Sequence, residues 1–444
     1  MTKILLKNGT VINRGKKEVK DILIEDMWIR EMGNGISSKN CKIIDVSGKW
    51  IIPGIIDDQV HFREPGLIHK ADIGSESRAA LLGGVTSFME MPNTKPAAIT
   101  NEELEKKYDR ASESSPCNYS FFIGATNDNI EEILRADPSE ICGIKAFMGS
   151  STGDLLVDDN DALDTLFKRA HMLIATHCED EQTIVRNNSL FIEKFGKSLT
   201  AHHHPLIRNT EGCYKSSSFA VSLAKEHNTR LHILHISTEK ELDLFRNDIP
   251  LNEKRITAEV CVHHLYFNDK DYDVLGNRLK CNPAVKTQKD QDALFKALLD
   301  DRLDIIATDH APHTLEEKSQ DYIHSPSGLP LVQHSLLIMM DFYQRGKISM
   351  EEIVRKMCHA PADMFDIDKR GYLDEGFYAD IIVVDPEAKN IITKENIAFK
   401  CGWSPLEGKI FTGAIDHVFV NGIQKVKNQT IVNDTSGMRL TFNR

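Results

Sequence analysis

Short apolar runs alternate with stretches of helical periodicity from residue 51 to about residue 310. Runs bounded by Gly, Pro and polar residues predict buried strands, and the periodic stretches between them predict helices. The predicted strands are residues 51–56, 85–91, 118–123, 143–147, 172–176, 231–235, 256–262 and 303–308. The predicted helices are residues 72–82, 101–111, 161–170, 211–227 and 289–299. Eight strands over this length indicate an α/β fold with a (β/α)8 barrel of the TIM type, and they disfavour the alternative of a doubly wound open sheet.

Both ends of the chain have a different pattern, with no helical periodicity. Short strands are predicted at residues 3–6, 19–24, 28–32 and 42–45, and again at residues 379–385, 409–411 and 417–422. We therefore expect a small composite β-sandwich domain made of residues 1–50 together with 370–444, interrupted by a barrel domain at residues 51–369. No repeat and no Pro- or Ser-rich linker separates the two units, so we expect them to pack tightly.

Composition narrows the class of protein. Lys and Arg number 54 against 66 Asp and Glu, a formal charge of -12, and no basic run is present. This balance argues against nucleic acid and membrane surfaces as partners, but it leaves room for a local basic pocket that binds a small anion. The nine cysteines are scattered and contain no Cys-x-x-Cys pair, which is typical of a reduced, cytosolic protein. The N-terminus lacks the pattern of a signal peptide, so we expect a cytoplasmic protein.

The first predicted barrel strand is followed by a polar stretch at residues 57–66. Alternation along an extended strand places Asp57, Gln59, His61 and Arg63 on one face at the end of that strand. An imidazole there suits a metal, and a guanidinium suits an anionic substrate. A solvated turn with an isolated histidine is the alternative interpretation.

The ends of the other predicted strands decide between these two interpretations. In such barrels the chemistry gathers at the carboxyl ends of the strands. Those ends carry His61, Lys145, His177, His235 and Asp309. Nitrogen and oxygen donors without a thiolate suit zinc or a similar divalent ion with an open position for water. Lys145 lies inside a strand, where it is either ion-paired, deprotonated, or carboxylated to a carbamate that bridges two metals.

Five segments resemble the signature segments of the dihydroorotases, members of the cyclic amidohydrolase group of the amidohydrolase superfamily. These segments are residues 53–57, 61–66, 91–94, 233–237 and 307–314, and the resemblance covers essentially the whole chain. It implies that His61, carboxylated Lys145, His177, His235 and Asp309 hold one or two zinc ions, and that Asp309 also shuttles the proton. The substrate-binding positions that it implies are Arg63, Asn93, Asn282, His313, Ser327 and Gly328.

Two positions depart from the family pattern. Gln59 replaces the first metal-binding histidine, and an amide oxygen is a much poorer zinc ligand than an imidazole. Lys286 replaces an arginine in the segment at residues 282–286, which loses the planar fork of the guanidinium. The first departure puts one metal position in doubt, whereas the site made by Lys145, His177 and His235 is intact.

The implied activity is the reversible hydrolysis of dihydroorotate to N-carbamoylaspartate in pyrimidine biosynthesis. One alternative is a cyclic amidase of the dihydropyrimidinase, hydantoinase or allantoinase type, whose substrates lack the carboxylate that Arg63, Asn93 and His313 suit. Another, favoured by Gln59, is an inactive homologue that serves as a structural partner of aspartate carbamoyltransferase. A homodimer is expected from the family alone.

The remaining histidines and one cysteine receive less weight. Residues 202–204 form a run of three histidines that suits a loop better than a ligand set. His263, His264 and His310 are expected to form hydrogen bonds around the site without binding metal directly. Cys178 is expected to pack on the face of its strand opposite His177.

Overall fold

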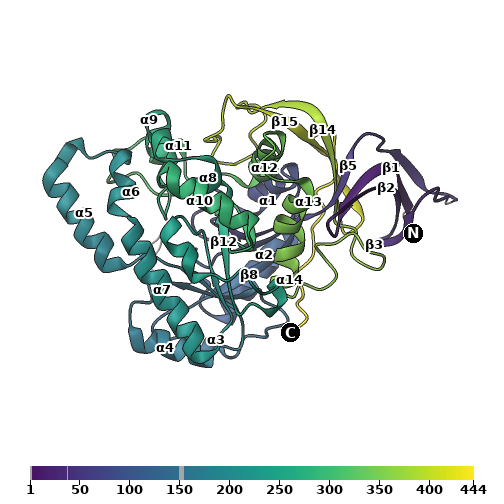
Figure 1. The fold of residues 1–444 in the computed structure, drawn as a ribbon. Coiled ribbons are helices and arrows are strands. Elements are labelled where there is room, and N and C mark those ends of the chain that lie inside the picture. The colour runs from purple at the N-terminus through teal and green to yellow at the C-terminus, as the bar shows by residue number, and fades with distance from the viewer. Residues whose placement is uncertain (1–2, 38, 150–154) are drawn as a thin grey trace.

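Eight parallel strands form a nearly closed barrel at the centre of the computed structural model, which describes residues 3–37, 39–149 and 155–444 (Figure 1). The strands are β6 (Ile55–Val60), β7 (Val85–Glu90), β8 (Asn118–Gly124), β9 (Gly143–Phe147), β10 (Ile174–His177), β11 (Leu231–Ile233), β12 (Ile256–Cys261) and β13 (Ile305–Ala307). They follow one another in sequence order, and a parallel bridge between Val60 and His310 links the two outer strands. The predicted barrel is confirmed.

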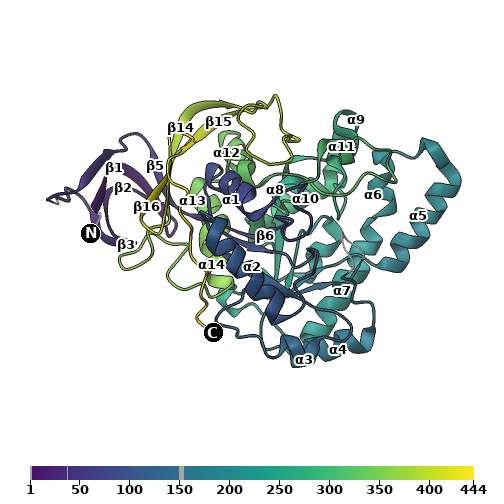
Figure 2. The same ribbon diagram turned by 180° about the vertical axis from the view of Figure 1, so that it is seen from behind.

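Helices cover the outside of the barrel in both views (Figures 1 and 2). The longer ones are α1 (Ile73–Leu82), α2 (Asn101–Ser114), α4 (Asn160–Arg169), α5 (Glu181–Phe195), α7 (Thr210–His227), α10 (Gln288–Leu299) and α12 (Ser335–Gln344). The shorter ones are α3 (Ile130–Ile133), α6 (His204–Ile207), α8 (Val262–Tyr266), α9 (Tyr272–Leu275), α11 (Leu315–Lys318), α13 (Met350–Val354) and α14 (Ala360–Met364). Side-chain caps such as Asp72 on α1 and Thr287 on α10 bind the first free N–H groups. None of the helices in the described part of the chain is both long and apolar enough to cross a membrane.

The two chain ends form a second, nine-stranded sheet, in which purple N-terminal and yellow-green C-terminal strands lie side by side (Figures 1 and 2). Its strands are β1 (Lys3–Asn13), β2 (Lys16–Glu25), β3 (Trp28–Gly33), β4 (Lys42–Asp45), β5 (Trp50–Pro53), β14 (Ile381–Ile391), β15 (Ile410–Val420), β16 (Ile423–Lys427) and β17 (Thr430–Ile431). The ends meet where β5 pairs antiparallel with β14, with Ile51 opposite Val383. A separate sheet from both chain ends was predicted, and it is present.

The apolar run at residues 51–56 is two strands rather than one. β5 belongs to the terminal sheet, and β6 begins the barrel after Gly54. A Cβ at Gly54 would collide with Thr86 Oγ1. Only glycine therefore fits at the point where the chain leaves the terminal sheet and enters the barrel. The prediction of a single strand was wrong because both halves are apolar and fully buried.

The amino-terminal end of the barrel is filled with apolar side chains. Ile56 and Leu173, near the starts of β6 and β10, belong there to one apolar cluster with Phe365 from the residue after α14 and Leu440 from the chain's last segment. Because this end is filled, the opening of the barrel lies at the carboxyl ends of the strands.

Candidate functional site

A single pocket at the carboxyl ends of the strands gathers nearly all of the predicted site residues. Its lining residues are Gln59, His61, Arg63, Asn93, Lys145, Phe147, His177, His235, Asn282, Asp309, Ala311, Ser327 and Gly328. His313 is the one predicted member outside this lining, and it contacts Arg63, since Arg63 Nη2 lies 3.1 Å from His313 Nε2. The predicted ligands and the predicted substrate-binding residues therefore lie together, at one end of the barrel.

Three of these residues have a left-handed backbone. The φ angles are 71° at Arg63, 41° at His235 and 46° at Asp309. Side chains other than glycine seldom adopt this region, and such conformations cluster at functional sites. Each of these residues follows the last residue of a barrel strand by two or three positions, at the turn that ends the strand.

His61 and Asp309 face one another with atoms that both accept hydrogen bonds. His61 Nδ1 donates to Asn93 Oδ1 over 2.8 Å, which leaves a lone pair on Nε2. That Nε2 lies 3.1 Å from Asp309 Oδ1. Burial lowers the pKa of His61, so the ring is neutral and the two lone pairs require a proton or a cation between them. This is the geometry of two ligands of one cation.

Gln59 lies beside the same carboxylate. Its amide nitrogen donates to Asp309 Oδ1 over 3.3 Å, and its oxygen lies 3.6 Å from Cys261 Sγ. The side chain thus makes a hydrogen bond where the family pattern has a metal-binding imidazole. Asp57, predicted to share this face, lies outside the pocket lining, and its carboxylate accepts a hydrogen bond of 2.6 Å from Thr308 Oγ1.

His177 and His235 form the second pair of ring nitrogens, with Nδ1 of His177 3.0 Å from Nε2 of His235. Burial lowers the pKa of both rings, so both are neutral. Behind His177, Glu179 Oε2 lies 3.1 Å from Nε2. Burial alone would raise the pKa of Glu179, but the ion pair with Arg208 and the contact with His177 lower it to about 2. The carboxylate therefore stays charged and holds the His177 ring in place.

Lys145 lies between these two pairs. Burial lowers its pKa to about 7, so much of the amine is neutral at physiological pH. Its Nζ lies 4.6 Å from the centre of the Phe147 ring, and none of the residues in the described ranges forms a salt bridge with it. A buried neutral amine is a nucleophile that carbon dioxide can carboxylate, because the reaction needs the free lone pair.

Positive charge enters the pocket at Arg63, with Lys70 and His313 behind it and outside the lining. Arg63 Nε donates to Pro312 O over 3.1 Å, and burial lowers the pKa of this guanidinium only to about 10, so it remains charged. Lys70 Nζ lies 2.9 Å from His313 Nδ1 and 3.1 Å from Glu317 Oε1. Since Lys70 is a donor, His313 Nδ1 accepts, and its Nε2–H points to Ser327 O at 3.0 Å. The His313 ring is thus occupied by Lys70 and Ser327, and it packs against the Arg63 guanidinium from outside the pocket lining.

The loop that carries Ser327 and Gly328 is held from behind by a buried lysine. Lys318 Nζ donates to the carbonyls of Lys280, Pro326 and Gly328 over 2.9, 2.9 and 3.1 Å. Gly328 has a φ of 147°, and a Cβ there would collide with Ala311 O. These contacts fix the loop edge of the pocket.

Several supporting residues were not predicted. Glu179 follows His177 by two positions, so strand alternation could have indicated it, but Arg208, Lys70 and Lys318 have no local signal in the sequence. Among the histidines of residues 202–204, His202 pairs with Asp273 on the surface, and His204 is buried with Nε2 3.1 Å from Asn282 Oδ1.

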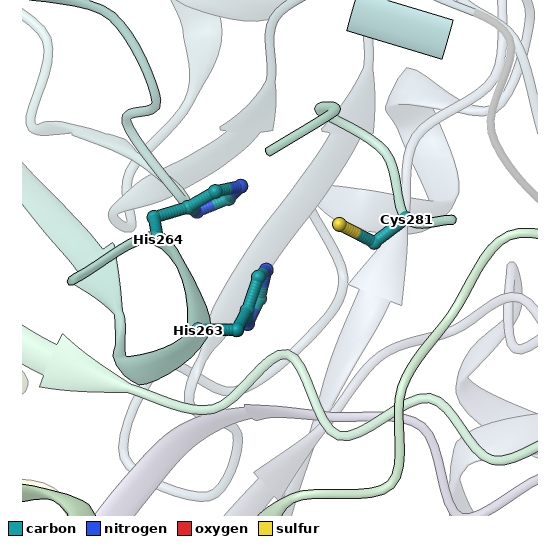
Figure 3. A group of neighbouring side chains, drawn as sticks. All are labelled: His263, His264 and Cys281. Carbon is teal, nitrogen blue, oxygen red and sulfur yellow. The ribbon is translucent and has the colours of Figure 1, made fainter. Parts of the chain in front are cut away.

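The other side chains considered in the sequence analysis do not line the pocket. His310 lies 2.8 Å from Glu76 and accepts from the backbone of Leu331, so it forms hydrogen bonds as expected. Cys178 is buried, as expected. His264 Nε2 lies 3.1 Å from Pro283 O, and His263, His264 and Cys281 turn toward one another (Figure 3). Lys286 donates to Ala284 O and lies outside the pocket lining.

Comparison with known proteins agrees with this fold and site. Residues 50–424 match the amidohydrolase family. The chain is 32% identical over 410 residues to a dihydroorotase of Bacillus cytotoxicus, covering 91% of this chain and 94% of that one. It is 30% identical over 396 residues to a dihydroorotase of Halobacterium salinarum, covering 88% and 90%. The chain belongs to the amidohydrolase family, within its cyclic amidohydrolase group.

Solved structures with the same fold carry other activities in their names. An L-hydantoinase (dihydropyrimidinase) from Arthrobacter aurescens superposes with a TM-score of 0.94 at 23% identity, covering 99% of this chain and 100% of that one. A dihydropyrimidinase from Brevibacillus agri superposes with a TM-score of 0.89 at 22% identity, covering all of both chains. At these identities the likeness establishes the fold alone.

Proposed function

We propose that the protein is a dihydroorotase, which hydrolyses the ring amide of (S)-dihydroorotate to N-carbamoyl-L-aspartate and closes the same ring in the reverse direction, as in pyrimidine biosynthesis. The observation that carries the proposal is the buried, charged Arg63 guanidinium, which lines one pocket together with His61 and Asp309 and is backed by His313. Dihydroorotate has a carboxylate on its ring, and a guanidinium binds a carboxylate by charge-assisted hydrogen bonds. The dihydroorotase relatives support the same assignment.

The pocket residues that carry nitrogen and oxygen lone pairs suit zinc. His61 and Asp309 would hold one ion, His177 and His235 would hold a second, and a carboxylated Lys145 would supply a further oxygen ligand. His61 Nε2 and Asp309 Oδ1, two acceptors 3.1 Å apart, need a proton or a cation between them, and the two ring nitrogens of His177 and His235 lie 3.0 Å apart at the other position. When bound, zinc supplies Lewis-acid polarisation of the ring carbonyl and activation of water. Gln59 makes the first position the weaker of the two.

The protein's own residues then orient the substrate and move the proton. The Arg63 guanidinium, backed by His313, holds the ring carboxylate, with Asn282 and the Ser327–Gly328 edge around the ring. Asn93 holds the His61 ring by its Nδ1, and Glu179 holds that of His177. Asp309 accepts the proton of the attacking water at its carboxylate and delivers it to the departing ring nitrogen.

The rival cyclic amidases differ in the charge of the substrate. Hydantoin, dihydrouracil and allantoin lack the ring carboxylate, so Arg63 and His313 would hold nothing in such a complex. Turnover of dihydroorotate, and ring closure of N-carbamoylaspartate, should exceed turnover of the uncharged rings by at least about 100-fold in kcat/KM, the value of two lost charge-assisted hydrogen bonds. Activity confined to the uncharged rings would overturn the proposal.

Gln59 favours one further alternative, an inactive scaffold that associates with another enzyme. Purified protein should contain zinc and cyclise N-carbamoylaspartate if it is an enzyme. Protein that is folded by circular dichroism, replete with added zinc and bicarbonate, and still inactive on every cyclic amide would establish the scaffold instead.

A further inference from the structure

Three charged or ionisable side chains lie inside the barrel below the pocket, and the proposed reaction does not use them. Asp58 comes from β6, His232 from β11 and Glu259 from β12, and each is fully buried. β6 is a neighbour of neither β11 nor β12 in the sheet, so Asp58 reaches these residues across the barrel interior. A register shift between Asp57 and Val60 in the pairing of β6 with β7 accounts for this inward turn.

Each of the three presents an atom that has no hydrogen-bond partner within the described ranges. Both Asp58 carboxylate oxygens, Glu259 Oε2 and His232 Nε2 are in this state. The other ends are fixed, since His232 Nδ1 lies 2.9 Å from Thr257 Oγ1, and Glu259 Oε1 accepts from His235 N over 2.9 Å. Ligand atoms of the three residues lie within 4.8 Å of one another. Buried polar atoms without partners are rare and require an explanation.

Charge gives the first reason to place a cation here. Burial and the neighbouring Asp58 raise the pKa of Glu259 to about 8, and contacts with the two carboxylates raise the pKa of His232 to about 9 against the effect of burial. The excess of negative charge therefore draws either protons or a cation to this group, because burying an unbalanced charge is very costly. A divalent cation between them makes the group neutral and provides a partner for Asp58, Glu259 and His232 at once.

Distance gives the second reason. His232 Nε2 lies 3.4 Å from Asp58 Oδ2 and 3.5 Å from Glu259 Oε2. Both separations exceed the usual N–H···O range of about 2.7–3.2 Å. Zinc bonds of about 2.0–2.2 Å in a tetrahedron place neighbouring ligand atoms about 3.3–3.6 Å apart. Octahedral magnesium at about 2.1 Å would place them only about 3.0 Å apart.

We propose that Asp58, His232 and Glu259 bind a divalent ion of the zinc type as a structural site, separate from the pocket above it. The ion would tie β6 to β11 and β12 across the barrel. Because Glu259 also accepts from the backbone of His235, the site would hold the turn that carries a pocket ligand. This inference rests on its own residues and stands whatever ring the pocket hydrolyses.

A neighbouring group offers an instructive contrast. His263 and His264 from α8 face Cys281 from a loop, with ligand atoms within 4.8 Å (Figure 3). Burial keeps these rings and the thiol neutral, since it lowers the pKa of His263 to about 4 and raises that of Cys281 to about 12. No unbalanced charge demands a cation there, so we assign none.

The test compares zinc content and its position. Wild type, Asp58→Asn and the double variant His177→Ala/His235→Ala are purified from zinc-supplemented cells and analysed for zinc per chain. Asp58→Asn, which keeps the size of the side chain, should lose about one zinc per chain and keep its remaining zinc. The double variant should lose the pocket zinc held by His177 and His235 and should keep the ion between Asp58, His232 and Glu259, which the anomalous peak locates. Diffraction at the zinc edge on wild-type crystals should show an anomalous peak between Asp58, His232 and Glu259.

The alternative is a protonated His232 shared by the two carboxylates, without metal. Equal zinc content in wild type and Asp58→Asn, with no anomalous peak between the three residues, would overturn the proposal. If the pocket binds no zinc, the double variant will contain as much zinc as wild type. If the site at Asp58 binds none, Asp58→Asn will contain as much zinc as wild type, so the two proposals fail in different variants.

Discussion

The two walls of the pocket are equally buried but handle charge in opposite ways. On the ligand wall, made of His61, Lys145, His177, His235 and Asp309, burial lowers the pKa of all three imidazoles and of the lysine. On the cation wall, made of Arg63 with Lys70 and His313 behind it, burial lowers the pKa of each group as well, but the Arg63 guanidinium, with a pKa of about 10, stays charged. The first wall therefore offers lone pairs, and Arg63 on the second offers permanent positive charge. The difference shows that burial selects function through the intrinsic pKa of the residue.

Removing the proton-transfer group of the ligand wall should have the largest effect. Asp309→Ala should lower kcat for dihydroorotate by about 10³-fold or more, because general acid–base catalysis and a zinc ligand are lost together. Steady-state kinetics on protein with wild-type circular dichroism measures this. A kcat within tenfold of wild type would refute the role of Asp309.

Changing the cation wall should affect binding more than chemistry. Arg63→Ala should raise KM for dihydroorotate by about 30- to 100-fold with a smaller change in kcat, because charge-assisted hydrogen bonds to the carboxylate are worth about 2–3 kcal/mol. Arg78→Ala, at a partly exposed residue of α1 that pairs with Asp434, is the matched control and should leave both constants unchanged. A fall in kcat alone would show that the two walls do not divide the work in this way.

The lowered pKa of Lys145 predicts how metal-free protein regains activity. The neutral amine is needed for carboxylation, and with a pKa of about 7 its fraction falls about tenfold from pH 8 to pH 6. Reactivation by zinc at a fixed concentration of dissolved carbon dioxide should therefore be about tenfold slower at pH 6 than at pH 8. Lys145→Arg should not reactivate at either pH. A rate independent of pH would mean that Lys145 acts without a carbamate.

The smallest effect is expected at Gln59. Gln59→His should bind zinc more tightly at the position of His61 and Asp309, while kcat changes by no more than about threefold, because an imidazole is a better ligand than an amide. Competition with a zinc-binding dye and titrated kinetics measure the two quantities. Unchanged zinc affinity would show that the ring cannot reach the ion from this position.

Prediction from the sequence was most successful where the signal is local. Apolar runs located all eight barrel strands, and the residues that end them were read directly from the order of the chain. Prediction from the sequence failed at two places where the structure depends on contacts between segments far apart in the chain. The run at residues 51–56 is apolar throughout, so only the pairing of β5 with β14 shows that it serves two sheets. The inward turn of Asp58 depends on a bulge that alternation cannot predict.

The sequence alone therefore determined the order of strands and helices, the family, and the types of side chain at the strand ends, because each depends on periodicity or on residue identity. The tertiary structure decided which side chains of the site face each other, which of these side chains are neutral, and which further residues hold them in place. Glu179, Arg208, Lys70 and Lys318 are supporting residues of this kind, and Asp58, His232 and Glu259 meet only inside the closed barrel. The physical reason is that pKa and ligand geometry depend on burial and on distances of a few ångströms between segments far apart in the chain.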